Sequence, residues 1–305
     1  MKEAVIVSTA RTPIGKAFRG AFNDTQAQEM AGHAIAEAVK RSKVSKEEID
    51  DVIIGAAGQQ GSQQGNVARQ SLLRAGLPVS VAGMSLDRQC ASGMMAIATA
   101  AKEITEDGMT ITVGGGVESV SLVRNENFRM DRARDPWLEE NIPSLYMTMI
   151  ETAENVAKRY GISREAQDEY SLQSQMRTAI AQQNGYMDKE IVPLKSTMKY
   201  KDKETGEISS HDVCIERDEG NRPSTTFEGL SALKPVFKDG IYLKEGEYMT
   251  AGNASQLSDG ASASVLMEAR EAEKRNLSPL GAYRGIAVAG CAPDEMGIGP
   301  IYAVP

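Results

Sequence analysis

The sequence predicts an α/β protein that carries an inserted helical segment, and two observations lead to this prediction. Short apolar segments typical of strands alternate with helical patterns over residues 3–119 and again over 249–289. The intervening residues 120–248 hold most of the isolated charge runs and the chain's one tryptophan, Trp137. We therefore expect a domain with a mostly parallel sheet and helices on both faces, interrupted by a helical domain.

The elements of the first region follow from apolar patterns and from the residues that end them. Val5, Ile6 and Val7 are consecutive and indicate a strand, whereas apolar residues at helical spacing begin at Ala27. Gly76 ends a later helix. The predicted elements are strand 3–10, helix 27–41, strand 51–57, helix 66–75, strand 83–86, a helix from Cys90 to about 107 and strand 109–117.

The second region is predicted as helices and a polar hairpin, after which the α/β pattern returns. Gly161 and Gly185 stand where glycine commonly ends a helix, and a turn is expected at Thr205 and Gly206. The predicted elements are helices 151–160 and 164–184, hairpin 195–213, strand 261–267, helix 268–275 and strand 281–289.

Composition excludes several classes of function. The chain has 305 residues, of which 41% are hydrophobic and 25% charged, and a net charge of −8 argues against non-specific nucleic-acid binding. No apolar run reaches the roughly 18 residues of a membrane helix and no signal peptide is recognised, so we expect a cytoplasmic protein. Three widely spaced cysteines and two isolated histidines favour neither disulfides nor a bound metal.

Cys90 is the candidate nucleophile. It stands between an apolar run and a helix whose residues 91–101 are nearly all small or apolar, as expected of a helix buried on every side. A thiol at a helix N-terminus lies near the positive end of the dipole and near unpaired N–H groups, which favour a thiolate and later an oxyanion. The alternative is a small buried side chain, and the pattern alone leaves both interpretations open.

Two glycine clusters have structural and functional interpretations. Residues 55–65, GAAGQQGSQQG, follow a strand and precede a helix, but their spacing departs from dinucleotide-binding motifs, so a flexible loop is favoured over a nucleotide site. Residues 114–116 end a strand and indicate close backbone packing or a turn in preference to a ligand site. We expect the other cysteines to be inert and the histidines to lie at the surface: Cys214, Cys291, His33 and His211.

Several long motifs resemble those of the thiolase family, which comprises acetyl-CoA acetyltransferases and 3-ketoacyl-CoA thiolases. DRQCASGMMAI, around Cys90, resembles the nucleophile motif of that family. The other motifs occur in the family's order and cover essentially the whole chain: RTPIGKAFRGAF, GGGVESVS, TAENVAKRYGISREAQD, EIVPL, RPSTTFEGLSALKPVF, TAGNASQLSDGAS and MGIGP.

The resemblance implies a fold, an activity and an assembly. Two similar α/β halves would pack as five layers, with residues 1–119 and 249–277 in the first half, 120–248 as a loop domain that binds coenzyme A, and 278–305 as the start of a largely missing second half. The implied activity is acyl transfer between coenzyme A thioesters through an acyl-cysteine, with acetyl-CoA or 3-ketoacyl-CoA as substrates and no permanently bound cofactor. The resemblance also implies a homo-oligomer, a dimer or tetramer, if the full fold is present.

The resemblance further assigns site residues. Cys90 matches the cysteine that becomes acylated. Six residues match positions that contact coenzyme A: Arg222 near the nucleotide end, Ser255 and Ala251 along the pantetheine arm, and Met149, Phe237 and Met296 lining its tunnel. For the last three, packing in the core is the alternative.

Some family motifs have no counterpart in this sequence. The GHP segment, whose histidine activates the nucleophile, and the CxG segment, whose cysteine serves as acid and base, do not occur, and neither His211 nor Cys291 matches them. We therefore expect slow acylation at most and an inefficient Claisen step, and part of the helix after Cys90 is expected to lack cover. A non-catalytic protein that binds acyl-CoA or a partner is the alternative. Residues 241–249, IYLKEGEYM, also form a longer segment than the family leads us to expect.

Overall fold

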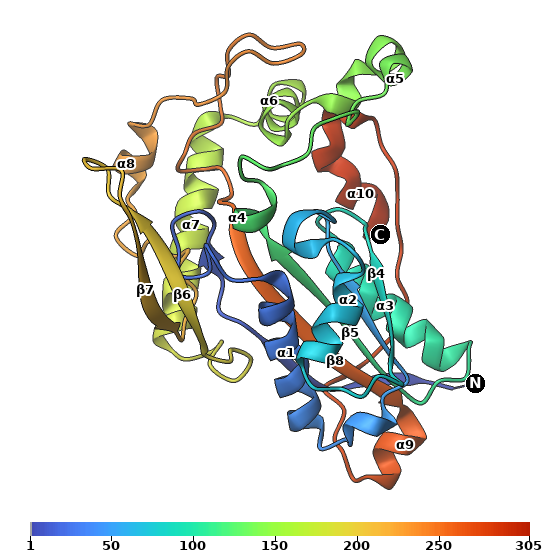
Figure 1. Ribbon diagram of the computed structural model, residues 1–305. Helices are drawn as coiled ribbons and strands as arrows, with labels where there is room; N and C mark the ends of the chain where they lie inside the picture. The colour runs from blue at the N-terminus through green and yellow to red at the C-terminus, as the bar shows by residue number, and fades with distance from the viewer. Residues whose placement is uncertain (1) are drawn as a thin grey trace. The chain divides into compact units, whose positions relative to one another are not determined.

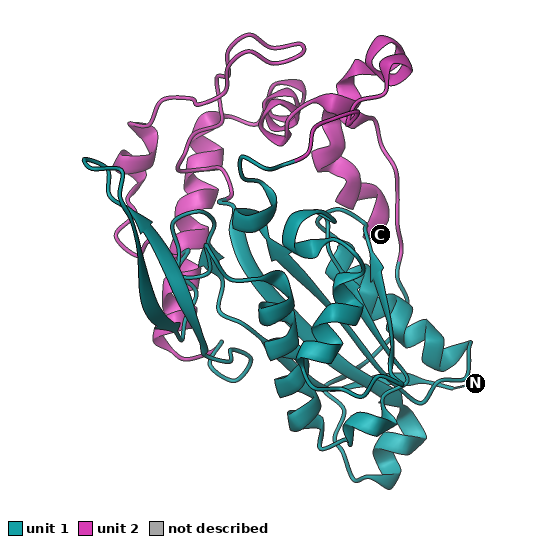
Figure 2. Ribbon diagram, viewed as in Figure 1, with its two compact units in different colours: residues 1–128, 187–220, 256–286 teal, residues 129–186, 221–255, 287–305 magenta. Residues whose placement is uncertain are grey.

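The computed structural model describes residues 2–305, which form two compact units (Figure 2). Unit 1 comprises residues 2–128, 187–220 and 256–286, and unit 2 comprises 129–186, 221–255 and 287–305. This division differs from the boundaries that we predicted. Residues 187–220, which include the polar hairpin of the predicted loop domain, belong to the sheet-containing unit.

Unit 1 is built on a mixed sheet. Within the described residues its seven strands are β1 (Ala4–Arg11), β2 (Gly15–Lys16), β3 (Asp51–Gly55), β4 (Ala82–Leu86), β5 (Ile111–Ser119), β8 (Ser258–Glu268) and β9 (Gly281–Ala282). Their order is β4-β3-β5-β8-β1-β9, with β2 on β8. β3 pairs parallel with β4 and β5, but β8 is antiparallel to both β5 and β1. The prediction of a mostly parallel sheet is wrong. β8 is antiparallel to its neighbours because it enters the sheet from the inserted segments and not through a helical crossover from β5, and β9 also pairs antiparallel with β1.

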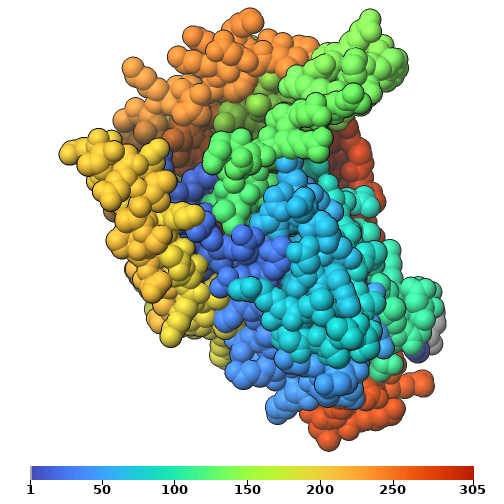
Figure 3. Space-filling view, viewed as in Figure 1, coloured from blue at the N-terminus to red at the C-terminus, as the bar shows by residue number. Residues whose placement is uncertain are grey.

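Helices cover both faces of this sheet. α1 (Ala27–Ser42) and α2 (Val67–Arg74) pack on one face, and α3 (Ser92–Thr105) packs on the other (Figure 1). Alternation along β3 fits this arrangement, since Val52 and Ile54 join the cluster of α1 and α2 whereas Ile53 joins that of α3. Figure 3 shows the face that α1 and α2 cover, in blue to cyan. The shorter helices of unit 1 are η1 (Lys46–Glu48), η2 (Gly61–Gln63), α4 (Val120–Val123) and α9 (Ala269–Lys274).

The helix after Cys90 is not buried on every side. Ala98, Ala101 and Ile104 are buried against the sheet, but Met94 is 68% exposed. The exposure of Met94 corrects the expectation of a helix buried on every side and agrees with the expectation that part of this helix lacks cover. The small residues reflect close packing on one side, and the longer apolar side chains near the N-terminus of α3 have less cover.

The hairpin of unit 1 matches its prediction, whereas the last predicted strand is wrong over most of its length. β6 (Leu194–Lys201) pairs with β7 (Ile208–Ile215), and Gly206 has the positive φ of +73° that its turn requires. Instead of a strand over 281–289, only β9 forms. The Tyr283 N–H donates to the Ala4 carbonyl (2.9 Å), and β1 begins at Ala4, so the chain beyond Tyr283 has no strand residues left to pair with.

Unit 2 consists of helices and loops. Its elements are α5 (Pro136–Asn141), η3 (Pro143–Tyr146), α6 (Met149–Arg159), α7 (Arg164–Gln183), α8 (Phe227–Ser231), η4 (Pro293–Ile298) and α10 (Gly299–Ala303). Thr148 and Ser163 cap α6 and α7 with their side chains, and Gly161 and Gly185 follow these helices with positive φ, as predicted. Across residues 2–305, none of the helices combines the length and apolar character needed to span a membrane.

Candidate active site

The turn that carries Cys90 is fixed by local hydrogen bonds. Gln89 has a positive φ of 48°, and its N–H donates to Asp87 Oδ1 at 2.6 Å. Ser92 Oγ donates to the Gln89 carbonyl (2.6 Å) and accepts from the Arg88 N–H (2.8 Å). A non-glycine residue in this conformation is strained, and such strain is common at functional turns. The turn leaves the Cys90 side chain exposed to solvent, so the interpretation as a small buried side chain is wrong.

The start of α3 offers hydrogen-bond donors beside this thiol. The Ser92 N–H is already bonded to the Gln89 carbonyl (3.0 Å). Among the described residues, no acceptor takes the N–H groups of Gly93 and Met94. These groups lie in the first turn of the helix, where the dipole is positive. The arrangement can therefore stabilise negative charge that develops next to Cys90.

Glycines of the sheet determine how closely α3 approaches. A Cβ at Gly55 would lie 2.1 Å from the Ser92 carbonyl carbon, and one at Gly114 would lie 2.6 Å from the Ile97 Cα. A Cβ at Gly116 would lie 3.0 Å from the Gly93 Cα. Of the two predictions for residues 114–116, close backbone packing or a turn, the structure confirms close packing: Gly114 and Gly116 set the position of the helix that follows Cys90, and Gly115 lies against β8.

The glycine-rich loop after β3 is held by the chain's own carboxylate. Glu118 accepts hydrogen bonds from the N–H groups of Ala57 (2.9 Å) and Gly58 (3.2 Å) and from Gln63 Nε2 (2.9 Å). Gln63 is only 1% exposed, and its Oε1 accepts from the Ser119 N–H. The loop is thus bound to the end of β5, in contrast to the flexible loop that we predicted. Two donors that a nucleotide phosphate would need are engaged, which disfavours the dinucleotide interpretation.

Three of the residues expected to contact coenzyme A, Arg222, Ala251 and Ser255, lie in unit 2 and are exposed to solvent. Arg222 is exposed, and its backbone is held by Gln175 Oε1, which accepts from the Arg222 N–H at 2.8 Å. Ala251 and Ser255 are exposed as well, in the loop that follows residues 241–249. These positions leave the three residues accessible to a ligand.

The apolar residues of the predicted tunnel divide into two kinds. Met149 is 56% exposed at the start of α6, and Met296 is 42% exposed in η4, so neither is a core residue. Phe237 is 7% exposed, with its ring against Gly240 and its Cβ against Gly246. For Phe237 the geometry favours the alternative of packing.

Charged side chains hold η4 against α6. Arg159 forms ion pairs of 2.6 Å with Asp294 and with Glu295, and Asn155 Nδ2 donates to the Asp294 carbonyl at 3.2 Å. The Tyr160 hydroxyl donates to Glu295 (3.0 Å), which raises the pKa of Tyr160. These contacts fix the segment that carries Met296 on the helix that begins with Met149.

The sequence interpretation missed the buried carboxylates of α6. Glu151 and Glu154 are 1% and 2% exposed, although glutamate is rarely buried without a partner. The spacing of the two glutamates along the helix could have indicated their burial. Both lie on the helix face of Ala157, which helical periodicity places toward the interior.

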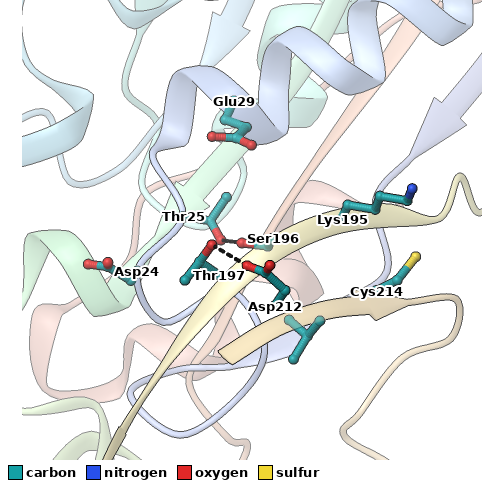
Figure 4. A pocket seen from close by; sticks show the side chains of 9 residues that line it. Asp24, Thr25, Glu29, Lys195, Ser196, Thr197, Asp212 and Cys214 are labelled. Atoms are coloured by element: carbon teal, nitrogen blue, oxygen red, sulfur yellow. Dashed lines mark hydrogen bonds between the residues drawn. The ribbon is translucent and has the colours of Figure 1, made fainter. Parts of the chain in front are cut away.

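A cavity of about 660 Å³ lies between the start of α1 and the hairpin of unit 1 (Figure 4). Its lining includes Asp24, Glu29, Lys195, Asp212 and Cys214, and Thr197 Oγ1 donates to Asp212 within it. Side chains of both charges therefore line this cavity. Among residues 2–305, no cluster of His, Cys, Asp and Glu side chains is arranged to hold a metal ion.

Comparisons with known proteins find one family and many relatives. The family described as "Thiolase, N-terminal domain" matches residues 4–270. The 3-ketoacyl-CoA thiolase of Bacillus subtilis (strain 168) is 40% identical over 311 residues, covering 100% of this chain and 76% of that protein. The beta-ketoadipyl-CoA thiolase of Pseudomonas putida is 39% identical over 319 residues, with shares of 100% and 76%. The crystal structure of the Bacillus anthracis acetyl-CoA acetyltransferase superposes with a TM-score of 0.82 at 37% identity, covering 100% of this chain and 75% of that chain.

Proposed function

This chain belongs to the thiolase family, and we propose that it is an acyl-CoA C-acyltransferase in which Cys90 accepts the acyl group. The single observation that carries the proposal is the exposed Cys90 thiol, which precedes a helix whose Gly93 and Met94 N–H groups have no acceptor among residues 2–305. Coenzyme A thioesters, acetyl-CoA or 3-ketoacyl-CoA, are the proposed substrates. Coenzyme A is then a substrate or product and not a resident cofactor.

The proposed first step is transfer of the acyl group to sulfur. The Cys90 thiolate attacks the thioester carbonyl and forms a new S–C bond, while the carbonyl oxygen becomes an oxyanion. The N–H groups of Gly93 and Met94 are the proposed donors to this oxyanion. Loss of one such donor typically costs about 10²- to 10³-fold in rate. The intermediate collapses when the C–S bond to coenzyme A breaks, and coenzyme A leaves as a thiolate that takes up a proton.

Residues of unit 2 are the proposed contacts for coenzyme A. Arg222 supplies an exposed cation for phosphate in a chain whose net charge is −8. Ala251 and Ser255 are accessible along one loop and suit the pantetheine arm. The exposed Met149 and Met296 offer apolar surface for the ligand. Phe237 packs against Gly240 and Gly246 of the loop that precedes Ala251.

We propose that the 305-residue polypeptide performs the acylation step better than the complete reaction. A second base must remove a proton from carbon before a new C–C bond can form. The sequence holds no GHP or CxG segment to supply the groups that the family uses. Acetoacetyl-CoA thiolysis by this polypeptide at a rate of about 10 s⁻¹, typical of enzymes, would contradict this part of the proposal.

Mass spectrometry of the acylated protein tests the central proposal. Incubation with acetyl-CoA is expected to add one acetyl group, located on Cys90 after peptide mapping. Cys90→Ser should lose this product, whereas Cys214→Ser and Cys291→Ser serve as matched controls and should keep it. Binding of coenzyme A without acetyl-Cys90 would refute acyl transfer and favour the non-catalytic alternative.

We further propose that the protein acts in the cytoplasm as a homo-oligomer, a dimer or tetramer. Light scattering coupled to size-exclusion chromatography measures the assembly directly. A mass of 32.8 kDa at micromolar concentration, with no larger species, would refute the oligomer.

A further inference from the structure

We propose that Glu151 and Glu154 are positioning residues for coenzyme A binding, because they fix the loop that leads into Ala251 and Ser255. This inference rests on the proposed function, since it assumes that these two residues contact the pantetheine arm. It also gives a role to residues 241–249, the segment that is longer than the family resemblance leads us to expect.

Glu154 binds the part of the loop nearest to the proposed contacts. Its carboxylate accepts hydrogen bonds from the N–H groups of Glu247 (2.9 Å), Tyr248 (3.1 Å) and Met249 (2.7 Å). Three successive N–H groups thus converge on one side chain that is 2% exposed. Ala251 follows only two residues after the last of them, so any shift at Glu154 passes directly to that contact.

Glu151 binds the tip of the same loop, one helical turn earlier on α6. It accepts from the N–H groups of Ile241 (3.0 Å), Tyr242 (2.7 Å) and Leu243 (3.1 Å). Ile241 and Tyr242 have exposed side chains, so the tip has little apolar packing of its own. Backbone hydrogen bonds such as Gly240 N–H to the Leu243 carbonyl (2.8 Å) close the loop on itself, and the Glu151 carboxylate attaches its tip to α6.

The fit of the loop around both carboxylates is close enough to require glycine. A Cβ at Gly240 would lie 2.5 Å from the Glu151 carboxyl carbon, and one at Gly246 would lie 2.5 Å from Glu154 Oε1. Phe237 lies against both glycines. The loop therefore has glycine where the two glutamates approach it. This requirement is an observation separate from the hydrogen bonds.

A second set of hydrogen bonds, made by Asn253, fixes the segment that contains Ala251 and Ser255. Asn253 Oδ1 accepts from the Thr250 N–H (2.8 Å), and Asn253 Nδ2 donates to the Tyr248 carbonyl (2.9 Å) and to Asp168 Oδ1 (3.1 Å). Asp168 is 1% exposed on α7. Ala251 therefore lies between a backbone held by Glu154 and a side chain held by α7.

The charge of the two glutamates is part of the proposal. Within residues 2–305, neither carboxylate has a Lys or Arg partner at ion-pair distance, so backbone N–H groups provide its compensation. Glutamine has nearly the same shape but only one acceptor oxygen, and its NH₂ group would face N–H donors. Glu154→Gln is therefore expected to loosen residues 247–249 without removing side-chain volume.

Titration of the purified chain with two ligands tests the inference. Coenzyme A reaches both the nucleotide contact and the loop, whereas adenosine 3′,5′-bisphosphate represents the nucleotide end alone. We expect Glu154→Gln to raise the Kd for coenzyme A about tenfold, the equivalent of one lost charge-assisted hydrogen bond, and to leave the Kd for the bisphosphate unchanged. Glu151→Gln should have a smaller effect because it holds the more distant tip, and Glu245→Gln, an exposed glutamate of the same loop, is the matched control.

Hydrogen exchange of residues 241–255 accompanies the titration and should be faster in Glu154→Gln. An unchanged Kd for coenzyme A despite faster exchange would overturn the inference and leave the proposed function intact. Equal weakening of both ligands would also overturn it, because that result indicates general unfolding and not positioning. If the wild type bound neither ligand, the proposed function would fail and this inference with it. Gly246→Ala, which displaces the Glu154 carboxylate while retaining its charge, should reproduce the selective loss.

Discussion

Substitution of Gly55 by alanine tests whether the sheet sets the position of Cys90. Gly55 ends β3, and its Cα faces the backbone at the start of α3. An alanine Cβ would lie 2.1 Å from the Ser92 carbonyl carbon and 2.6 Å from the Gly93 nitrogen. Both atoms belong to the backbone, so no side-chain rotation can relieve the overlap. The helix and the turn before it must move together.

The size of the effect follows from these distances. Ordinary van der Waals contact begins at 3.4 Å, so the start of α3 must retreat by about 1.3 Å. Overpacking of a core typically costs about 1 to 3 kcal/mol, and we expect the upper part of that range because backbone must move. A displacement of about 1 Å at a reacting group can cost about 10²-fold in rate. Acetylation of Cys90 should therefore slow more than the loss of stability alone explains.

Two measurements check this prediction. Chemical denaturation gives the change in the free energy of unfolding, and mass spectrometry gives the rate of acetyl-Cys90 formation at a temperature where both proteins remain folded. Gly281→Ala is the control, because a Cβ at this edge position meets nothing within 4 Å. Gly55→Ala with the acetylation rate of the wild type would refute the argument that close packing on the sheet positions the nucleophile.

Two further predictions concern charged side chains. Burial, together with the neighbouring Asp51, raises the pKa of Glu103 to about 7, so the folded state retains a proton that the unfolded state releases near pH 4.5. The free energy of unfolding should therefore fall as pH rises from about 4.5 to about 7. Glu103→Gln should remove this fall, and at pH 8 its free energy of unfolding should exceed that of the wild type by about 1 kcal/mol, allowing for partial solvent exposure. Parallel pH profiles of the two proteins in denaturation experiments would contradict the prediction. Arg159→Ala removes both ion pairs to η4. The amides of residues 294–298 should therefore exchange faster while those of β5 do not, with Lys158→Ala as control. Unchanged exchange in η4 would show that the ion pairs do not hold it.

Elements with a strong local signal were predictable from the sequence. Consecutive β-branched residues identified β1, and apolar residues at helical spacing identified α1. Of the two structural interpretations of the glycines at 114–116, close packing is correct, because a side chain at Gly114 or Gly116 has no room beside α3 and one at Gly115 has no room beside β8. The turn at Gly206 followed from glycine's tolerance of positive φ. In each case the cause lies within a few residues of the pattern that reports it.

Features that depend on distant pairing were not predictable in the same way. β8 has the composition of any buried strand, but its antiparallel direction depends on where the chain re-enters the sheet. Residues 281–289 have a strand-like pattern, yet their pairing stops where β1 begins. Cys90 was identifiable as a candidate from its position before a helix, whereas its exposure required the structure.

The buried carboxylates explain why the loops were the hardest part to predict. Glu151 and Glu154 are buried and Glu118 is half-buried, and each binds N–H groups of a loop that is distant in sequence. The buried Asp259 accepts in the same way from the N–H of Ser121 in α4. The donors are backbone groups, which every residue except proline possesses, so the partner leaves almost no mark on the loop sequence. The mark that does remain is glycine at 240 and 246, where a carboxylate lies too close for a Cβ. A glutamate on the inward face of a helix, together with two glycines in a distant loop, is therefore the sequence pattern that this arrangement produces, and it leads directly to the segment proposed to bind coenzyme A.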